Sequence, residues 1–243
     1  MTTNRDTIYA QTLGDPGLFT FNKDVVGVFP DMINRSVPGY ATVISMTGLL
    51  AARYARTGTR IYDLGCSLGA SLLSAARQPN CQTNTFIGID NSEAMLTAAR
   101  DVLDKEVPGL AIELIESDIL DAPIDNASVV IMNYTLQFLP IASRLPLLKK
   151  IRSALAPGDA LILSEKIKLD SPTMDDTMIA MHHDFKRAKG YSDLEIAQKR
   201  QALENVLIPE PLDIHFERLK KAGFSDGSCW FQCFNFASMI AIA

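Results

Sequence analysis

Short apolar runs alternate with amphipathic stretches from Ile61 to about Lys166, and this alternation constrains the fold more than any other feature. Apolar runs of about four to six residues are typical of buried strands, and the longer stretches between them are typical of helices. In chain order they read RIYDLG, SLLSAARQ, FIGID, SEAMLTAARDVL, AIELIESD, SVVIMNY, ASRLPLLKKIRSAL and DALILSEK. Because strands that alternate with helices pair in parallel, we predict an α/β protein with a doubly wound, mostly parallel sheet.

Local signals set two element boundaries within this pattern. Asn91 or Ser92 is placed to cap the helix that contains SEAMLTAARDVL. The run LAPGD at 155–159 predicts a turn after a helix that ends near Leu155.

The length of 243 residues fits one domain, in which we distinguish four sections. Residues 1–57 form a helical cover with a proline break, and residues 58–169 form the α/β core. Residues 170–206 form a polar helical insertion after the fifth strand, either as solvated helices or as a lid or subunit contact. Residues 207–243 add a helix and an antiparallel hairpin, in which the two-residue period predicts Cys229, Phe231 and Cys233 on one face.

Composition excludes several functional classes. The net charge of −5 and the absence of a basic stripe argue against direct binding of nucleic acid. Cys66, Cys81, Cys229 and Cys233 lack metal-ligand spacing, so we expect free thiols and no metal site. No apolar run approaches the roughly 18 residues of a membrane helix, and residues 1–15 lack signal-peptide features, so we expect a cytoplasmic protein.

The run YDLGCSLGAS at 62–71 joins the first strand to the next helix. Gly65 and Gly69 permit a tight turn whose backbone N–H groups face a ligand. Ser67 occupies the position where a dinucleotide loop keeps a glycine against the pyrophosphate. Asp63 would repel a pyrophosphate but would favour an ammonium or sulfonium group. The loop therefore indicates a positively charged nucleotide ligand.

Polar residues also end the next three strands, at the edge where open α/β sheets bind ligands. Asp90 suits two ribose hydroxyls, Asp118 suits an exocyclic amine such as that of adenine, and Asn133 lies at the same edge. Any one of them could be only a turn or helix-cap residue. Taken together, they favour S-adenosylmethionine, which carries adenine, ribose, a sulfonium and an amino acid.

The chain resembles a class I methyltransferase in its acid–glycine loop and in the runs GIDNS and SDI. Five longer runs are more specific: VFPDMINRSVPGY at 28–40, NYTLQFL at 133–139, SEK at 164–166, MHHDFKRAKGYSDLEIAQKRQALENV at 181–206 and WFQCFNF at 230–236. Over nearly the whole chain these runs resemble the carboxy-S-adenosyl-L-methionine synthase family. The first ten residues and IASRLPLLKK depart from the family pattern, at positions that we expect to be peripheral.

The resemblance implies a homodimeric enzyme that uses prephenate to carboxylate the methyl group of S-adenosylmethionine, with phenylpyruvate as the second product. A separate tRNA carboxymethyltransferase would then use carboxy-S-adenosylmethionine to modify a wobble uridine. Carried over to this chain, the nucleoside and amino-acid contacts are Tyr40, Gly65, Cys66, Ser67, Asp90, Asn91, Asp118, Ile119 and Asn133. Arg200 would hold the new carboxylate, since a guanidinium matches a carboxylate with two hydrogen bonds.

Other functions remain open from the sequence. An ordinary S-adenosylmethionine-dependent methyltransferase, or a non-enzymatic S-adenosylmethionine sensor, could use the same loop. A nicotinamide dehydrogenase is disfavoured by Asp63 and Ser67. The general base is not identified, because His182 and His183 point to different sides of a helix and also suit packing or capping.

Overall fold

The computed structural model describes residues 4–14, 17, 19, 20 and 22–243. The remaining positions, all within the predicted cover at 1–57, include residues 1–3 and 15 of the segment assessed for a signal peptide. In the part of the chain that is described, no helix has both the length and the apolar character to cross a membrane.

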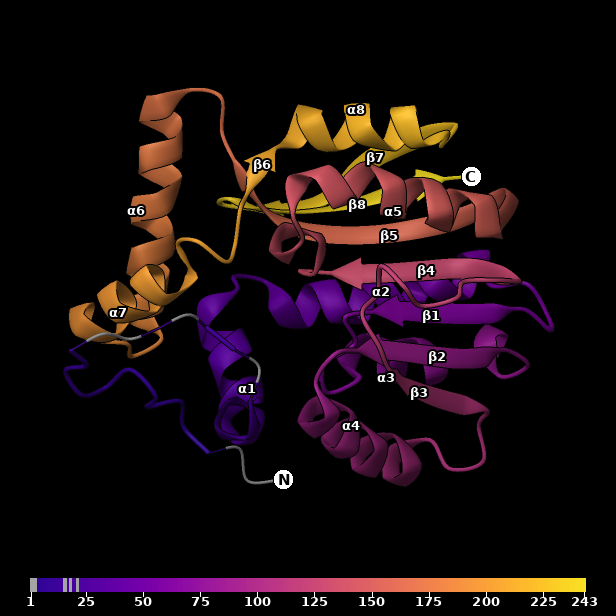
Figure 1. Ribbon diagram of the computed structural model, residues 1–243, viewed down its shortest axis with the longest axis horizontal. Helices are drawn as coiled ribbons and strands as arrows, with labels where there is room; N and C mark the ends of the chain where they lie inside the picture. The colour runs from indigo at the N-terminus through magenta and orange to yellow at the C-terminus, as the bar shows by residue number, and fades with distance from the viewer. Residues whose placement is uncertain (1–3, 15–16, 18, 21) are drawn as a thin grey trace.

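An eight-stranded sheet with the path β3-β2-β1-β4-β5-β8-β7 forms the centre of the molecule (Figure 1). Its parallel part contains β1 Arg60–Leu64, β2 Thr85–Asp90, β3 Ile112–Glu116, β4 Ala127–Asn133 and β5 Leu155–Lys168. The strand β8 Phe236–Ile242 runs antiparallel to β5 and pairs with β7 Asp226–Cys233, while the short β6 Glu210–Pro211 pairs with β5 off the main path. The predicted parallel sheet with an antiparallel C-terminal hairpin is confirmed.

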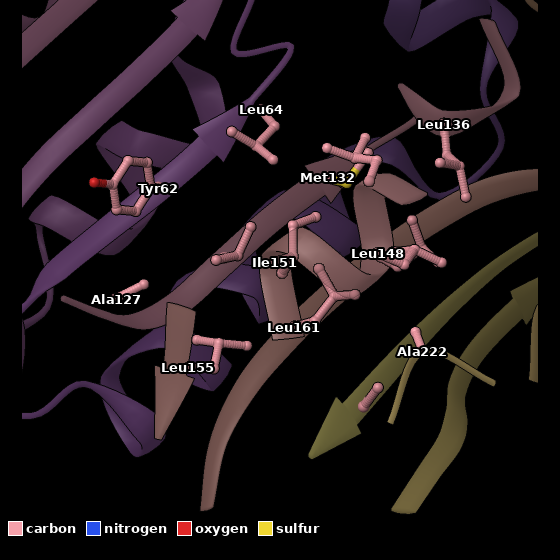
Figure 2. Close-up of a cluster of buried hydrophobic side chains, with 14 of the residues drawn as sticks. Tyr62, Leu64, Ala127, Met132, Leu136, Leu148, Ile151, Leu155, Leu161 and Ala222 are labelled. Carbon is pink, nitrogen blue, oxygen red and sulfur yellow. The ribbon is translucent and has the colours of Figure 1, made fainter. Parts of the chain in front are cut away.

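Helices cover both faces of the sheet. The first face packs on α2 Tyr40–Tyr54, α3 Ala70–Ala76 and α4 Glu93–Glu106 through a cluster that includes Leu72 and Ile131. The second face packs on α5 Ile141–Ala154 and α8 Leu212–Ala222 through the cluster in Figure 2, which includes Leu148 and Leu161. Each of the five parallel strands supplies residues to both clusters, so burial of both faces explains the nearly continuous apolar runs. Two short 3₁₀ helices, η1 Pro79–Cys81 and η2 Leu136–Phe138, complete the core.

Local caps agree with the sequence. Ser92 caps α4 and accepts a hydrogen bond from the backbone N–H of Met95 at 3.3 Å, so Ser92 rather than Asn91 is the N-cap.

The break between α1 Lys23–Ser36 and α2 falls at 37–39. Gly39 has a φ of 76°, and an added Cβ there would lie 2.4 Å from Cζ of Phe231.

The insertion consists of α6 Pro172–Ala188 and α7 Asp193–Leu203, which stand with α1 beyond the carboxyl ends of the parallel strands (Figure 1). A segment at 4–14 is tied to α7: the side-chain oxygen of Gln198 accepts from the N–H of Leu13 at 2.6 Å, and its amide donates to the carbonyl of Tyr9 at 2.9 Å. The Tyr191 hydroxyl donates to the carboxylate of Asp6. The insertion is therefore anchored at the strand ends rather than projecting into solvent.

Two local predictions are wrong. The run at 155–159 is not a free turn, because α5 ends at Ala154 and the run opens β5 as an irregular stretch between the pairs Ala127–Leu155 and Val129–Ala160. In β7 a bulge sets Cys229 opposite Met239 but Phe231 opposite Ser238. Paired residues share a face, so Cys229 lies on the face opposite to Phe231 and Cys233.

Candidate active site

A cavity of about 1030 Å³ opens at the carboxyl ends of the parallel strands, between the sheet and the helices α1, α6 and α7. Its walls include every site residue named from the sequence: Tyr40, Gly65, Cys66, Ser67, Asp90, Asn91, Asp118, Ile119, Asn133 and Arg200. Asp63 lines the same cavity. Residues spread over 160 positions, from 40 to 200, thus meet around one space.

The loop after β1 is held in a tight conformation against the sheet. Gly65 and Gly69 have φ values of 78° and 76°, and Ser67 adopts 50°, a left-handed conformation that is rare for a residue with a side chain. The N–H groups of Gly65 and Cys66 both donate to the carbonyl of Ile89, at 2.8 and 3.0 Å. An added Cβ at Gly65 would lie 2.4 Å from Oγ1 of Thr135, so only glycine allows this close approach.

Asp90 ties the loop to the second strand. One carboxylate oxygen accepts from the N–H of Ser67 at 2.9 Å, and the other accepts from the N–H of Ser92 at 3.0 Å. Burial raises the pKa of Asp90, whereas these backbone donors oppose that rise. Each oxygen keeps a second lone pair, so the carboxylate can still accept hydrogen bonds from a ligand.

Asp118 combines the two roles that the sequence left open. Its carboxylate accepts from the N–H of Leu120 at 2.9 Å, as in a turn that follows a strand. Its side chain is exposed and lines the cavity beside the buried Ile119. A turn residue can therefore still present acceptor oxygens to a ligand.

Asp63 is almost completely buried, with 2% of its surface exposed. Burial raises its pKa to about 8, the negative charge of Asp90 adds to the rise, and the backbone N–H of Leu72 opposes it. A cation in the cavity would stabilise the ionised carboxylate and restore a lower pKa. Asp63 is thus a buried acid whose ionisation would respond to a bound cation.

Asn133 lines the cavity, yet its side chain forms hydrogen bonds with other side chains of the protein. Its amide donates to Oγ1 of Thr47 at 3.2 Å and to Oγ of Ser71 at 3.0 Å, and its oxygen accepts from Oγ of Ser164 at 2.7 Å. Both amide hydrogens are therefore engaged, and the residue joins α2, α3, β4 and β5 at the base of the cavity. No sequence pattern predicted this hydrogen-bond network.

Four cationic residues line the same cavity as the strand-end carboxylates, and we call them the cationic wall: Lys166 at the end of β5, Lys186 on α6, and Lys199 and Arg200 on α7. Of these four residues, only Arg200 was named from the sequence. Lys186 and Lys199 are 7% and 5% exposed, although a lysine in a charged helix is normally solvated. Their burial results from the docking of α6 and α7, which no local sequence pattern reveals.

His182 is engaged in a hydrogen bond and in ring packing. Its Nε2 lies 2.7 Å from the carbonyl of Ser36, and its ring meets that of Phe236 edge to face. Burial, followed by the charge of Lys186, lowers the pKa of His182 to about 3, while the hydrogen bond with Ser36 opposes the shift. The ring donates from Nε2 and remains neutral near neutral pH, which makes it a poor base. The pKa of His183 is also lowered, first by burial and then by Lys186.

Two buried charged residues hold the loop after β4. Glu165 lies in the run SEK, and Arg144 lies in the run IASRLPLLKK, so the expectation that this run is peripheral is wrong at Arg144. The carboxylate of Glu165 accepts from the N–H groups of Leu136 and Gln137, both at 2.9 Å. Arg144 is fully buried, donates to the carbonyl of Gln137 at 3.1 Å and pairs with Glu210. These contacts fix the loop at 134–139 along one side of the cavity.

The fold and the site define the class of the protein: an S-adenosylmethionine-dependent methyltransferase fold, with an acid–glycine loop after β1 and carboxylates after β2 and β3. The family model described as "Methyltransferase domain" matches residues 61–158. A putative O-methyltransferase of Nostoc punctiforme superposes with a TM-score of 0.64 at 15% identity, covering 91% of this chain and 59% of that one, which shows the fold alone.

Sequence comparison then gives the particular family. The chain is 54% identical to the carboxy-S-adenosyl-L-methionine synthase of Citrifermentans bemidjiense, over 99% of both chains. It is 52% identical to the synthase of the same name in Trichlorobacter lovleyi, over 100% of both. The protein belongs to the carboxy-S-adenosyl-L-methionine synthase family of enzymes, as the sequence motifs predicted.

Proposed function

We propose that the protein converts S-adenosylmethionine and prephenate to carboxy-S-adenosylmethionine and phenylpyruvate. The observation that carries this proposal is the pairing, in one cavity, of strand-end carboxylates with a cationic wall. The carboxylates suit a nucleoside and a cation, whereas the lysines and Arg200 suit a substrate and a product that carry carboxylates. Transfer of an intact methyl group would not need such a wall.

The volume of the cavity supports binding of S-adenosylmethionine together with a second, smaller substrate. A pocket for one drug-sized ligand measures roughly 300 to 1,000 Å³, and this cavity of about 1030 Å³ lies just above that range. We assign the ribose to Asp90 and Asn91, the adenine edge to Asp118 and Ile119, and the amino-acid part to the loop. The loop contacts are Gly65, Cys66 and Ser67, with Tyr40 and Asn133 completing the wall.

The proposed reaction balances without an added oxidant or reductant. The bond from the prephenate ring to its carboxylate breaks, and the electron pair enters the ring and expels the ring hydroxyl as hydroxide. That hydroxide takes a proton from the sulfonium methyl group and becomes water. The resulting ylide carbon attacks the released carbon dioxide and forms the new carbon–carbon bond. This route needs no protein base, in agreement with the neutral, hydrogen-bonded His182.

Arg200 would hold the new carboxylate. It lies on α7, lines the cavity and adds its charge to that of Lys166. One charge-assisted hydrogen bond contributes roughly 1.5 to 3 kcal/mol, so retention of the product by Arg200 would be selective over S-adenosylmethionine. Closure of the cavity by α6 and α7 would protect the ylide from water.

The wider setting follows from the same proposal. A separate tRNA carboxymethyltransferase would use the product, so this protein need not bind tRNA itself, in keeping with its net charge of −5. We place the reaction in the cytoplasm, where that partner enzyme would act, and assign the active enzyme as a homodimer.

The test is to incubate the purified protein with S-adenosylmethionine and prephenate and to weigh the released nucleosides by mass spectrometry. We expect a species heavier than S-adenosylmethionine by one carbon dioxide, formed only with prephenate. Phenylpyruvate with bicarbonate is the matched control and should give none. Unmodified S-adenosylmethionine under every condition would contradict the proposal and favour methyl transfer or ligand sensing.

A further inference from the structure

Lys186 is a buried cation without a protein partner. It lies near the end of α6, is 7% exposed and lines the cavity. Among the residues that the structure describes, none forms a hydrogen bond or an ion pair with its ammonium group. An unpaired ammonium that has lost most of its water is costly to keep in a folded protein. An anion bound beside the ammonium group would offset this cost.

The surroundings of Lys186 carry an excess of positive charge. The positive charges of Lys199 and Lys166 act on it, and the one carboxylate that opposes them is Asp6. Asp6 is already engaged, because it accepts from the Tyr191 hydroxyl and lies 3.7 Å from the ammonium of Lys199. Lys199 also donates to Oγ of Ser36 at 3.1 Å. The positive potential at Lys186 is therefore not neutralised within the protein.

Burial, followed by the charges of Lys199 and Lys166, lowers the pKa of Lys186 to about 7, while Asp6 opposes the shift. Near neutral pH the ammonium group is therefore only partly protonated. An anion bound beside it would favour the charged form, so binding would draw a proton from solution.

We propose that Lys186 forms an anion subsite for the carboxylate that the second substrate keeps, which is the 2-oxo carboxylate of prephenate and of phenylpyruvate. This inference rests on the proposed function and divides the two carboxylates of prephenate between the lid helices. Arg200 on α7 holds the carboxylate that is transferred, and Lys186 on α6 holds the one that is retained. A substrate with two carboxylates is thereby selected over one with a single carboxylate.

The test measures phenylpyruvate binding by calorimetry, with the full chain saturated with S-adenosylmethionine. We expect Lys186→Met to weaken phenylpyruvate roughly tenfold to 150-fold, the range of one charge-assisted contact. Lys189→Met is the matched control, because this lysine lies three residues further on, is exposed and does not line the cavity. Affinity for S-adenosylmethionine should be unchanged in both variants.

Proton uptake gives a second measurement that a merely structural role would not change. At pH 7.5 the wild-type protein should take up a fraction of a proton on binding phenylpyruvate, seen as a difference in heat between buffers of unlike ionisation enthalpy. Lys186→Met should lose this uptake. Because that variant removes an unpaired buried charge and keeps the volume, we expect it to fold, with a melting temperature at or above that of the wild type.

The outcomes separate this inference from the function on which it rests. Wild-type carboxylation together with unchanged phenylpyruvate affinity and proton uptake in Lys186→Met would overturn the subsite and leave the function standing. A wild-type protein that neither binds phenylpyruvate nor forms carboxy-S-adenosylmethionine would overturn both. An equal loss in Lys189→Met would show a general charge effect and would also overturn the subsite.

Discussion

Replacement of Asp63 by asparagine should stabilise the protein and weaken its hold on a cationic ligand. The pKa of Asp63 is about 8 in the folded state, against 3.8 for the ordinary group. At pH 7 the side chain is therefore ionised in the unfolded protein and takes up a proton when the protein folds. At 1.36 kcal/mol per pH unit between 3.8 and 7, this costs about 4 kcal/mol. Asparagine carries no charge, but its buried amide hydrogens need partners, which costs roughly 1 to 3 kcal/mol. We expect a net gain of about 1 to 3 kcal/mol at pH 7.

The pH dependence identifies the cause of the gain. Because the folded pKa lies above the unfolded value, the folded state binds more protons between about pH 4 and pH 8. The contribution of Asp63 to stability therefore falls as pH rises through this window. Urea denaturation of the wild type and of Asp63→Asn at pH 5, 7 and 8 should show a difference that grows with pH. A constant difference would refute the electrostatic explanation.

Binding completes the test. Asp63→Asn should bind S-adenosylmethionine at least tenfold more weakly than the wild type, and ligand binding to the wild type at pH 7 should release a proton. A loss confined to S-adenosylmethionine, with S-adenosylhomocysteine unaffected, would place Asp63 near the sulfonium. An equal loss for both would place it near the ammonium group. Unchanged affinity for both would refute a cation-binding role.

Three further substitutions test other parts of the site. Arg200→Ala should spare S-adenosylmethionine and weaken carboxy-S-adenosylmethionine by about 2 kcal/mol in calorimetry, and equal losses would exclude the carboxylate role. Asp90→Ala should weaken both ligands alike, and unchanged affinity for either would remove Asp90 from the ribose site. Arg144→Met leaves Glu210 with one cation fewer and should lower the free energy of unfolding by about 3 kcal/mol. Arg77→Met, at a pair that is about half exposed, should change it by less than about 1 kcal/mol in the same urea titration.

Much of the fold could be predicted because apolar residues recur with different periods in strands and in helices. The position of the site could be predicted because the carboxyl ends of parallel strands meet at one edge of the sheet. That geometry brought Asp63, Asp90 and Asp118 to one cavity. The bulge after Cys229 could not be predicted, because an extra residue in one strand does not show in the pattern of residue types. It nevertheless places Cys229 on the face of the sheet opposite to Phe231 and Cys233. The burial of Lys186 could not be predicted either, because it depends on how the helices dock. The charged residues beside it in the sequence are typical of a solvent-exposed helix.

The contacts between the segment at 4–14 and the region around α7 have a consequence for synthesis on the ribosome. Tyr191 meets Asp6 across 185 residues, and Gln198 meets Tyr9 across 189. Strand β8, which pairs with β5, is translated after every other strand of the sheet. The segment at 4–14 must therefore wait for most of the chain to be translated before it finds its partners. High contact order of this kind slows folding, so the substrate cavity should be among the last parts of the nascent protein to form.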